Sequence, residues 1–427
     1  MVDYGEIKMS GFLDRASVIV IGGGAAGMMA AVTAARSGAN VVLFEKNDRL
    51  GKKLRITGKG RCNVTNDCDK NEFLSNVASN SKFLFAAISR FSTADTKDFF
   101  EECGVPLKTE RGKRVFPISD KAQDIVSALE NACVEAGVQI INKKVDSLII
   151  EDGAARGVVV DGRPYGAKCV IVATGGMSYP RTGSTGDGYR FAKRCGHTIV
   201  DIKPSLVPLV AQGKLCAHLQ GVSLKNIGFM IRDNESGKTV YEDFGEMMFT
   251  HFGLTGPVVL SASAHLSNMT GGRYTAIIDM KPALDHKTLD TRILSDFSEC
   301  INKDFINSLD ALLPQKMIPI MVGLSGIDAR KKVNSITKEE RERLVSLIKS
   351  IEIPIEDFRP INEAIITKGG VSVSEISPKT MESKITKGLY FAGEVLDLDA
   401  YTGGFNLQIA FSTAVLAGEN AAWSSFE

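Results

Sequence analysis

The clearest pattern in the chain lies near its N-terminus, where an apolar run is followed at once by glycines. Val18 to Ile21 is a run of β-branched residues, which is typical of a buried strand, and it ends at Gly22. Ala25 to Ser37 is rich in helix formers and stops at Gly38. A second apolar segment, Ala39 to Glu45, follows directly. The pattern predicts a strand, a glycine turn, a helix and a second strand.

The next part of the chain predicts a helix and then a β-meander. Asp120 to Ala136 carries its apolar residues on one helical stripe. Short turns separate three strand-like segments, which are Val145 to Ile150, Gly157 to Val160 and Lys168 to Ala173. Ser184 to Gly188 is a further glycine turn that begins a helix. It is suited to lie against an anion, with a plain helix cap as the alternative.

From about residue 197 the pattern changes to short β-rich segments, which continue to Met280. Pro282 to Ser350 is helical in pattern, and Ile365 to Val373 returns to strand. These changes predict three parts. A discontinuous dinucleotide-binding domain covers residues 1–196 and 355–427, a β-rich inserted domain covers 197–281 and part of 351–375, and a helical cap domain covers 282–350.

Length and composition fit this division. The chain has 427 residues, which is too many for one ordinary core, and 44% of them are hydrophobic. The formal net charge is +1, without blocks of like charge, so the electrostatic footprint of a nucleic-acid-binding protein is missing. We therefore expect a small-molecule substrate and no nucleic-acid partner.

Cysteine usage and the N-terminus indicate a cytoplasmic protein without metal. The eight cysteines form no C-x-x-C pair and no zinc-site spacing, so we expect reduced thiols. Charged residues before the first apolar run, from Asp3 to Arg15, leave no room for a secretory signal. Ser17 to Ala35 has the length of a membrane span, but its central glycines favour a buried strand and a helix instead.

The first glycine turn has the spacing of a dinucleotide-binding motif, Gly22-x-Gly24-x-x-Gly27. Gly22 permits the tight turn, Gly24 lets the backbone approach a pyrophosphate, and Gly27 lets helix and strand pack closely. The helix that begins at Ala25 and Ala26 directs its N–H groups at the phosphates. Glu45, eighteen positions after Gly27, would accept hydrogen bonds from ribose hydroxyls, which favours FAD or NAD over NADP.

A second glycine-led helix near the C-terminus favours FAD over NAD. Gly388 to Glu394 predicts a short buried strand that ends in Gly393 and an acidic residue. A glycine pair then precedes a long helix, whose first residues follow Gly404 and are Phe405, Asn406 and Leu407. Such a helix N-terminus would stabilise the negative charge that collects near flavin N1 on reduction. An ordinary strand–helix packing pair is the alternative.

At this point the sequence resembles the BaiN-like NAD(P)/FAD-dependent oxidoreductases, which are also described as aminoacetone-oxidase-like flavoproteins of the glutathione-reductase superfamily. The resemblance covers essentially the whole chain. Its most specific motifs are GRCNVTN, which ends at Asn66, and GGFNLQ, which begins at Gly403. Gly58-Lys59-Gly60 departs from the three glycines that family members often carry there. The resemblance implies an α/β fold, in which a Rossmann-type FAD-binding domain carries an inserted β-barrel-like domain and a small helical domain.

The resemblance and the glycine turns together give a set of expected FAD-binding residues. The basic cluster from Lys52 to Arg61 follows the ribose-binding acid, so its cations can neutralise the pyrophosphate. A second basic cluster, from Lys108 to Arg114, is interpreted as surface charge. Besides those of the two glycine turns, the expected cofactor-binding residues are Lys46, Lys53, Arg61, Asn63, Val145, Thr174, Gly175, Gly176, Asp187, Gly393 and Glu394.

Two side chains are candidate proton donors. Tyr401 stands just before the Gly403-Gly404 turn, and a phenol could protonate carbon or an enolate oxygen. Its alternative is an aromatic cover for the flavin. His251 lies in a loop dense in motif residues, with a structural histidine as the alternative.

The remaining cofactor predictions follow from what the motifs lack. The chain has a single G-x-G-x-x-G, and Cys62-x5-Cys68 does not have the spacing of a redox disulfide. We therefore expect non-covalent FAD, with NAD(P)H as a transient co-substrate. The resemblance implies reduction of an activated C=C bond, with 3-oxo-4-ene or 4,6-diene steroid or bile-acid substrates, by hydride transfer through flavin N5. Alternatives are an amine oxidase or dehydrogenase, and a non-catalytic redox sensor or RNA-associated flavoprotein.

Overall fold

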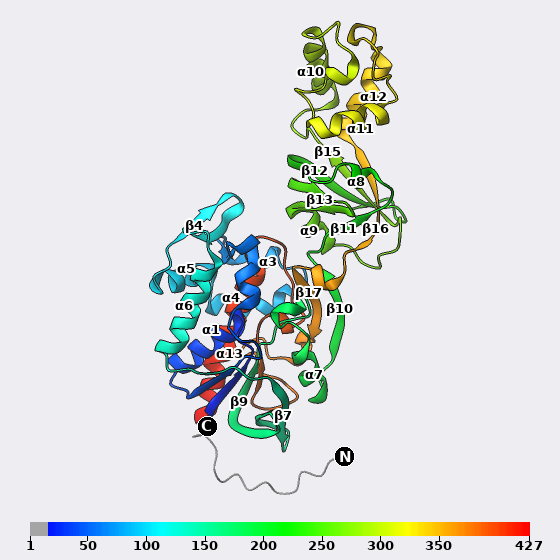
Figure 1. The fold of residues 1–427 in the computed structure, drawn as a ribbon. Coiled ribbons are helices and arrows are strands. Elements are labelled where there is room, and N and C mark those ends of the chain that lie inside the picture. The colour runs from blue at the N-terminus through cyan, green and yellow to red at the C-terminus, as the bar shows by residue number, and fades with distance from the viewer. Residues whose placement is uncertain (1–15) are drawn as a thin grey trace. The chain divides into compact units, whose positions relative to one another are not determined.

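The computed structural model describes residues 16–427, which form two compact units (Figure 1). The first unit contains the described residues up to Ser205 together with Ala364–Glu427, and the second contains Leu206–Glu363. The charged residues Asp3 to Arg15, which argued against a secretory signal, lie outside the described residues. Among residues 16–427, no helix is both long and apolar enough to cross a membrane.

A seven-stranded sheet forms the centre of the first unit. The inner part of β9 pairs in parallel with β1 and β18, and its outer part pairs antiparallel with β8, so the predicted meander is confirmed. In sheet order the strands are β6 (Gln139–Ile141), β2 (Val41–Phe44), β1 (Ala16–Ile21), β9 (Arg163–Val172), β8 (Ala154–Val160) and β7 (Val145–Glu151), with β18 (Leu389–Phe391) also on β9.

Two helices cross each other closely beside this sheet. They are α1 (Ala25–Arg36) and α13 (Phe405–Phe426), which pack together although nearly 400 residues separate their starts (Figure 1). A Cβ on Gly418 would lie 2.6 Å from the carbonyl oxygen of Ala30, so the approach requires glycine there. The Ala-rich faces of both helices are buried, as the apolar pattern predicts.

Smaller elements complete the first unit. β3, β5 and β4 form a three-stranded sheet, and β10 pairs antiparallel with β17. The bounds of these elements are α2 (Lys52–Ile56), β3 (Thr65–Asn66), α3 (Lys70–Ser75), α4 (Phe85–Arg90), α5 (Thr93–Glu102), β4 (Leu107–Glu110), β5 (Arg114–Pro117), α6 (Ala122–Glu135), α7 (Asp187–Arg194), β10 (Ile199–Ser205) and β17 (Ile366–Val371).

The second unit is built on a closed six-stranded antiparallel barrel, as the β-barrel-like prediction required. In barrel order its strands are β11 (Leu209–Ala211), β14 (Gly253–Thr255), β13 (Thr239–Phe249), β12 (Ser223–Asp233), β15 (Tyr274–Asp279) and β16 (Ile351–Phe358). Its helices are α8 (Leu215–His218), α9 (Pro257–Ser263), α10 (His286–Ser298), α11 (Ile318–Ser325) and α12 (Lys338–Lys349). The last three gather at one end of the barrel (Figure 1).

The boundaries of the two compact units differ from the domain boundaries that the sequence predicted. Residues 199–205, which the sequence placed in the inserted domain, form β10 and pair with β17 in the first unit. The helices of residues 282–350 share one hydrophobic core with the barrel, so they belong to the same compact unit. Local pattern identifies a strand but not its partner, because strand pairing depends on residues far away in the chain.

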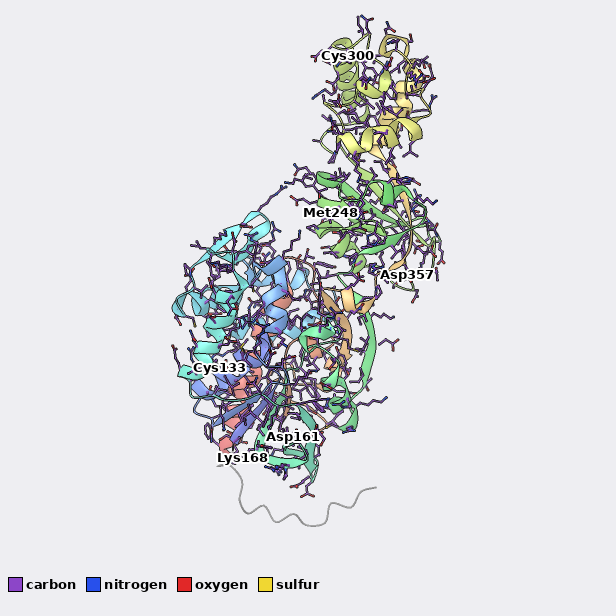
Figure 2. All side chains as sticks on the ribbon, in the orientation of Figure 1. Cys133, Asp161, Lys168, Met248, Cys300 and Asp357 are labelled. Carbon is purple, nitrogen blue, oxygen red and sulfur yellow. The ribbon has the colours of Figure 1, made fainter. Side chains whose placement is uncertain are left out.

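The cysteines are distributed over both units as free thiols. Cys133 lies on α6 in the first unit and Cys300 follows α10 in the second (Figure 2). Burial raises the pKa of the Cys62 and Cys133 thiols to about 12, which keeps both protonated and unreactive at neutral pH.

Candidate functional site

The turn between β1 and α1 has the geometry that a phosphate-binding loop needs. Gly22 has φ 107°, and a Cβ there would lie 2.5 Å from the carbonyl oxygen of Ala173. A Cβ on Gly27 would lie 1.7 Å from the carbonyl oxygen of Gly22, so Gly27 is required by helix–strand packing. A Cβ on Gly24 meets no protein atom within 4 Å. Gly24 caps α1 without a side-chain hydrogen bond, which leaves its first N–H groups for a ligand.

Glu45 lies beside this turn, at the end of β2. Its carboxylate Oε2 accepts a hydrogen bond from the Gly23 N–H at 2.7 Å. The other oxygen, Oε1, accepts from the backbone N–H of Asn47 at 2.7 Å and from its side-chain amide at 2.6 Å. Glu45 is only 7% exposed. Its three hydrogen-bond donors compensate the burial of the carboxylate and hold it next to the glycine turn. This is the position that a ribose-binding acid requires.

The C-terminal part of the chain reaches the same turn through Gly393. This residue follows β18 and has φ 77°. A Cβ on it would lie 2.7 Å from the Cβ of Ala26 in the first turn of α1. The Gly393 N–H donates to the Thr413 hydroxyl of α13 at 3.0 Å. The structure thus brings together the two glycine-led segments that the sequence singled out.

Lys53 and Glu394, which the sequence assigned separately to the cofactor, form an ion pair. Lys53 Nζ lies 2.7 Å from Glu394 Oε2 and also donates to the Ser178 hydroxyl at 2.6 Å. Glu394 Oε1 accepts from the Thr367 N–H at 2.9 Å. A Cβ on Gly176 would lie 2.3 Å from the Thr367 hydroxyl, so Gly176 allows this packing. The charge of Lys53 is therefore already compensated by protein.

Arg61, which the sequence assigned to the pyrophosphate, also pairs with carboxylates of the protein. Its guanidinium donates to Glu110 at 2.5 Å and to Asp120 at 2.5 Å, and it lies 4.2 Å from the centre of the Phe116 ring. The hydrogen bonds that Arg61 donates to Glu110 and Asp120 raise the pKa of its guanidinium. Glu110 and Asp120 thus compensate the positive charge of Arg61, which the sequence had assigned to the pyrophosphate. In the second basic cluster, Lys108 pairs with Asp120 at 2.8 Å.

Lys46 and Asp187 also pair with each other. Lys46 Nζ lies 2.7 Å from Asp187 Oδ2 and donates to the Thr185 hydroxyl at 2.6 Å. Burial opposes ionisation of Asp187, but the hydrogen bond and charge of Lys46 outweigh it and lower the carboxyl pKa. Asp187 is the first residue of α7, where a negative charge is also favourable. The pair joins the segment after β2 to the start of α7.

Two buried polar atoms of residues that the sequence assigned to the cofactor have no hydrogen-bond partner. They are the side-chain oxygen of Asn63 and the hydroxyl oxygen of Thr174. A buried polar group without a partner costs about 1–3 kcal/mol, so such atoms in a binding region indicate a polar ligand. Thr174 precedes Gly175 (φ 70°) in the loop after β9, and Val145 is a buried residue at the start of β7. The open turn, the carboxylate and these two atoms fit a bound FAD.

The N-terminus of α13 depends on its glycine pair. Gly403 has φ 130° and Gly404 has φ 100°, and a Cβ on Gly404 would lie 2.3 Å from the carbonyl oxygen of Thr65. The Asn406 side chain holds the preceding loop, because its oxygen accepts from the Ala400 N–H at 2.9 Å and its amide donates to the Ala400 carbonyl at 2.7 Å. Phe405 is buried in the core.

The backbone N–H groups of the first turn of α13 therefore remain for a ligand. They belong to Phe405, Asn406 and Leu407. The structural role of the Asn406 side chain was not predicted, since nothing local in the sequence identifies Ala400 as its partner.

The two proton-donor candidates lie in different units. Tyr401, in the first unit, is half-buried, and burial followed by the charge of Asp399 raises the pKa of its phenol. Asp399 is fully buried. Its Oδ2 accepts from the Ser205 hydroxyl at 2.9 Å and its Oδ1 has no partner. His251, in the second unit, is exposed, and its ring contacts Phe252 edge-on at 5.1 Å. No local sequence pattern identified Asp399 as a neighbour of Tyr401.

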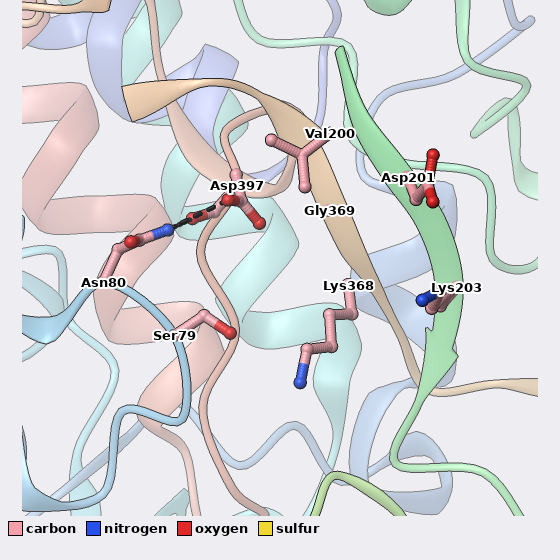
Figure 3. A pocket seen from close by; sticks show the side chains of 8 residues that line it. All are labelled: Ser79, Asn80, Val200, Asp201, Lys203, Lys368, Gly369 and Asp397. Atoms are coloured by element: carbon pink, nitrogen blue, oxygen red, sulfur yellow. Dashed lines mark hydrogen bonds between the residues drawn. The ribbon is translucent and has the colours of Figure 1, made fainter. Parts of the chain in front are cut away.

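A pocket of about 450 Å³ lies in the first unit (Figure 3). It is lined from β10, β17 and the loop at Asn80, whose side-chain amide donates to Asp397 Oδ2 at 3.0 Å. Lys203 and Lys368 stand directly opposite each other in the β10–β17 pair. On β17 the hydroxyl of the neighbouring Thr367 accepts from the Met177 N–H at 2.8 Å. Within residues 16–427 no cluster of side chains suited to a metal ion is present.

The contribution of the α13 N–H groups can be tested with Asn406→Pro. Proline fits the first helical turn but removes one N–H group, so we expect a more negative flavin potential and slower reduction by NAD(P)H, with FAD still bound. A helix-end charge interaction contributes up to about 2 kcal/mol when partly buried. Asn406→Ala is the matched control, because it removes the same bonds to Ala400 and keeps the N–H group. Equal potentials in the two variants would show that α13 does not act on the flavin.

Comparisons with known proteins show the family to which the chain belongs. Residues 16–420 match the family described as HI0933-like protein Rossmann domain. The chain is 32% identical, over 94% of its length and 98% of the relative's, to the 3-dehydro-bile acid delta(4,6)-reductase of Clostridium scindens. It is 31% identical, over 93% of its length and 96% of the relative's, to the ribosomal RNA dihydrouridine synthase of Haemophilus influenzae.

Among solved structures, the chain resembles the 3-ketosteroid delta1-dehydrogenase from Sterolibacterium denitrificans. The TM-score is 0.53 at 14% identity, covering 96% of this chain and 100% of the other. At that identity the likeness concerns the fold alone.

Proposed function

Because the chain belongs to the HI0933-like Rossmann family, whose fold binds FAD, we propose that it is an NAD(P)H-driven, FAD-dependent reductase of a C=C bond conjugated to a carbonyl group. The substrate class that we propose is a 3-oxo-4-ene or 4,6-diene steroid of the bile-acid type. The observation that carries the proposal is the near full-length similarity to a bile-acid reductase, together with a turn that is open at Gly24.

The residues of the chain bind and orient the cofactor. FAD, when bound, supplies the chemistry of accepting a hydride and passing it on. Gly24 and the first N–H groups of α1 would hold the pyrophosphate, and Glu45 would accept hydrogen bonds from the ribose. The N–H groups in the first turn of α13 would stabilise negative charge on the isoalloxazine.

Tyr401 is the proton donor in this proposal. Adding a hydride to a conjugated enone leaves an enolate, which needs a proton on carbon or oxygen. Since burial and the Asp399 charge raise the pKa of Tyr401, its phenol stays protonated at neutral pH and can donate. His251 lies in the second unit and is assigned no step.

Ribosomal RNA is the second candidate substrate, favoured by the similarity to a dihydrouridine synthase. The C5=C6 bond of uracil is also conjugated to a carbonyl, so the same chemistry would serve. Charge argues against it. Residues 206–363 contain 18 lysines and arginines against 20 aspartates and glutamates, and the whole chain has a formal net charge of +1. Binding of polyanionic RNA depends on clustered positive charge.

Anaerobic reduction of the bound flavin, followed by reoxidation, tests the proposal. The flavin should bleach on addition of NADH or NADPH and recover colour on addition of a 3-oxo-4-ene bile acid, but not of its saturated analogue. Recovery with a uridine-containing ribosomal RNA fragment and none with the enones would assign the second substrate. Bleaching by a small amine instead of NAD(P)H would contradict the reductase and support an amine dehydrogenase.

Tyr401→Phe tests the proton donor. A positioned acid contributes about 10²- to 10⁴-fold to a rate, so reoxidation by the enone should slow by at least about a hundredfold. FAD content and the rate of flavin reduction by NAD(P)H should stay at wild-type values, because neither needs the phenol. An unchanged reoxidation rate would exclude Tyr401 as the donor.

A further inference from the structure

The two most specific sequence motifs, which end at Asn66 and begin at Gly403, contact each other in the structure. The Asn66 side-chain amide donates to the carbonyl oxygen of Gly403 at 3.0 Å. The Thr65 hydroxyl donates to the side-chain oxygen of Gln408 at 2.5 Å. Gly404 approaches the Thr65 carbonyl so closely that a Cβ would clash. About 340 residues of chain separate these partners, so the contact is a tertiary one.

Gln408 is the centre of a larger set of contacts, which we call the Gln408 network. Its side chain is fully buried. Its oxygen also accepts from the Thr96 hydroxyl of α5 at 2.8 Å. Its amide nitrogen is within hydrogen-bond distance of three acceptors, which are the carbonyl oxygens of Phe91 (3.2 Å) and Ser92 (3.1 Å) and the hydroxyl of Ser412 (3.0 Å). Every polar atom of the Gln408 amide therefore has partners.

The Gln408 network lies at the N-terminal turn of α13. Gln408 is the fourth residue of the helix, and its backbone N–H closes the first turn onto the Gly404 carbonyl at 3.2 Å. The three N–H groups that precede it have no partner within the helix. The other end of α13 is held separately, by the Tyr390 hydroxyl, which donates to Ser424 at 2.9 Å, and by an ion pair between Arg90 and Glu419.

We propose that Gln408 is a positioning residue that fixes the direction of the first N–H groups of α13 and thereby sets the reduction potential of the bound flavin. The proposal rests on the FAD binding in the proposed function. Gln408 acts through the helix end and does not touch the cofactor. Its bonds to β3 and to the start of α5 prevent the first turn from tilting, and a tilted N-terminus would stabilise negative charge less.

The test uses the FAD-bound protein and two substitutions of different severity. Gln408→Glu keeps the shape and the acceptor oxygen but loses the amide donors. Thr96→Val removes a single hydroxyl that donates to Gln408 and keeps the side-chain shape. It therefore still tests the proposal if Gln408→Glu does not fold. Tyr390→Phe is the matched control, because it removes one hydroxyl at the far end of the same helix.

The readouts are the flavin midpoint potential and hydrogen exchange at residues 408–410, the first amides bonded within α13. In Gln408→Glu and Thr96→Val we expect faster exchange there. We also expect reduced flavin to bind about tenfold more weakly relative to oxidised flavin, which is a potential about 30 mV more negative. Tyr390→Phe should keep the wild-type potential.

Faster exchange at an unchanged potential would show that the Gln408 network is structural only, and so would an equal shift in Tyr390→Phe. Failure of the proposed function would be visible separately, as wild-type protein that binds no FAD.

Discussion

Gly24→Val should bind FAD at least about a hundredfold more weakly than wild type, while the thermal stability of its apoprotein stays close to that of the wild-type apoprotein. Gly24 has φ −84° and ψ −169°, a conformation that valine adopts freely, and its Cβ would meet no protein atom within 4 Å. The protein therefore tolerates the side chain. The space it enters is the space in front of the first turn of α1, where the pyrophosphate must approach the backbone.

Fluorescence titration of the apoprotein with FAD, together with thermal unfolding, measures both effects. Gly323→Val is the matched control, because Gly323 also faces open space but lies on α11 in the second unit. It should leave FAD affinity unchanged. Gly27→Ala should instead destabilise the fold itself, because its Cβ would lie 1.7 Å from the Gly22 carbonyl oxygen. Equal FAD affinity in Gly24→Val and wild type would show that the turn holds no phosphate.

Glu45→Ala should weaken FAD binding by about ten- to hundredfold. Hydrogen bonds to a charged acceptor contribute about 1.5–3 kcal/mol, and the substitution removes the carboxylate that would accept them from the ribose. The chain should still fold, because the hydrogen bonds of the Glu45 carboxylate among the described residues go to Gly23 and Asn47, and its backbone bond to Ile141 is kept.

Two further variants separate charge from position. Glu45→Gln keeps one acceptor oxygen, so its FAD affinity should fall between those of wild type and Glu45→Ala. Asn47→Ala removes a side-chain donor to Oε1 and leaves the carboxylate in place, so its effect on FAD binding should be smaller. If Glu45→Ala binds FAD as tightly as Asn47→Ala does, the carboxylate is not a cofactor ligand.

The sequence alone determined the features whose causes are local. The strand, glycine turn and helix from Ala16 to Arg36 follow from β-branched residues, glycine spacing and helix formers that are neighbours in the chain. The meander of β7, β8 and β9 and the long helix after Gly404 follow from patterns of the same kind. Gly27 was predicted to let helix and strand pack closely, and a Cβ there would lie 1.7 Å from the Gly22 carbonyl oxygen.

Only the tertiary structure decided which charged and polar groups meet. Lys53 pairs with Glu394, Arg61 with Asp120, and Gln408 with Thr65, over separations of 59 to 343 residues. A sequence shows that a cation follows the ribose-binding acid, but not whether a phosphate or a distant carboxylate compensates it, because ion pairing depends on distance in space. The same reason explains the domain boundary at Ser205. β10 belongs to the first unit because its partner β17 lies there, more than 160 residues later in the chain.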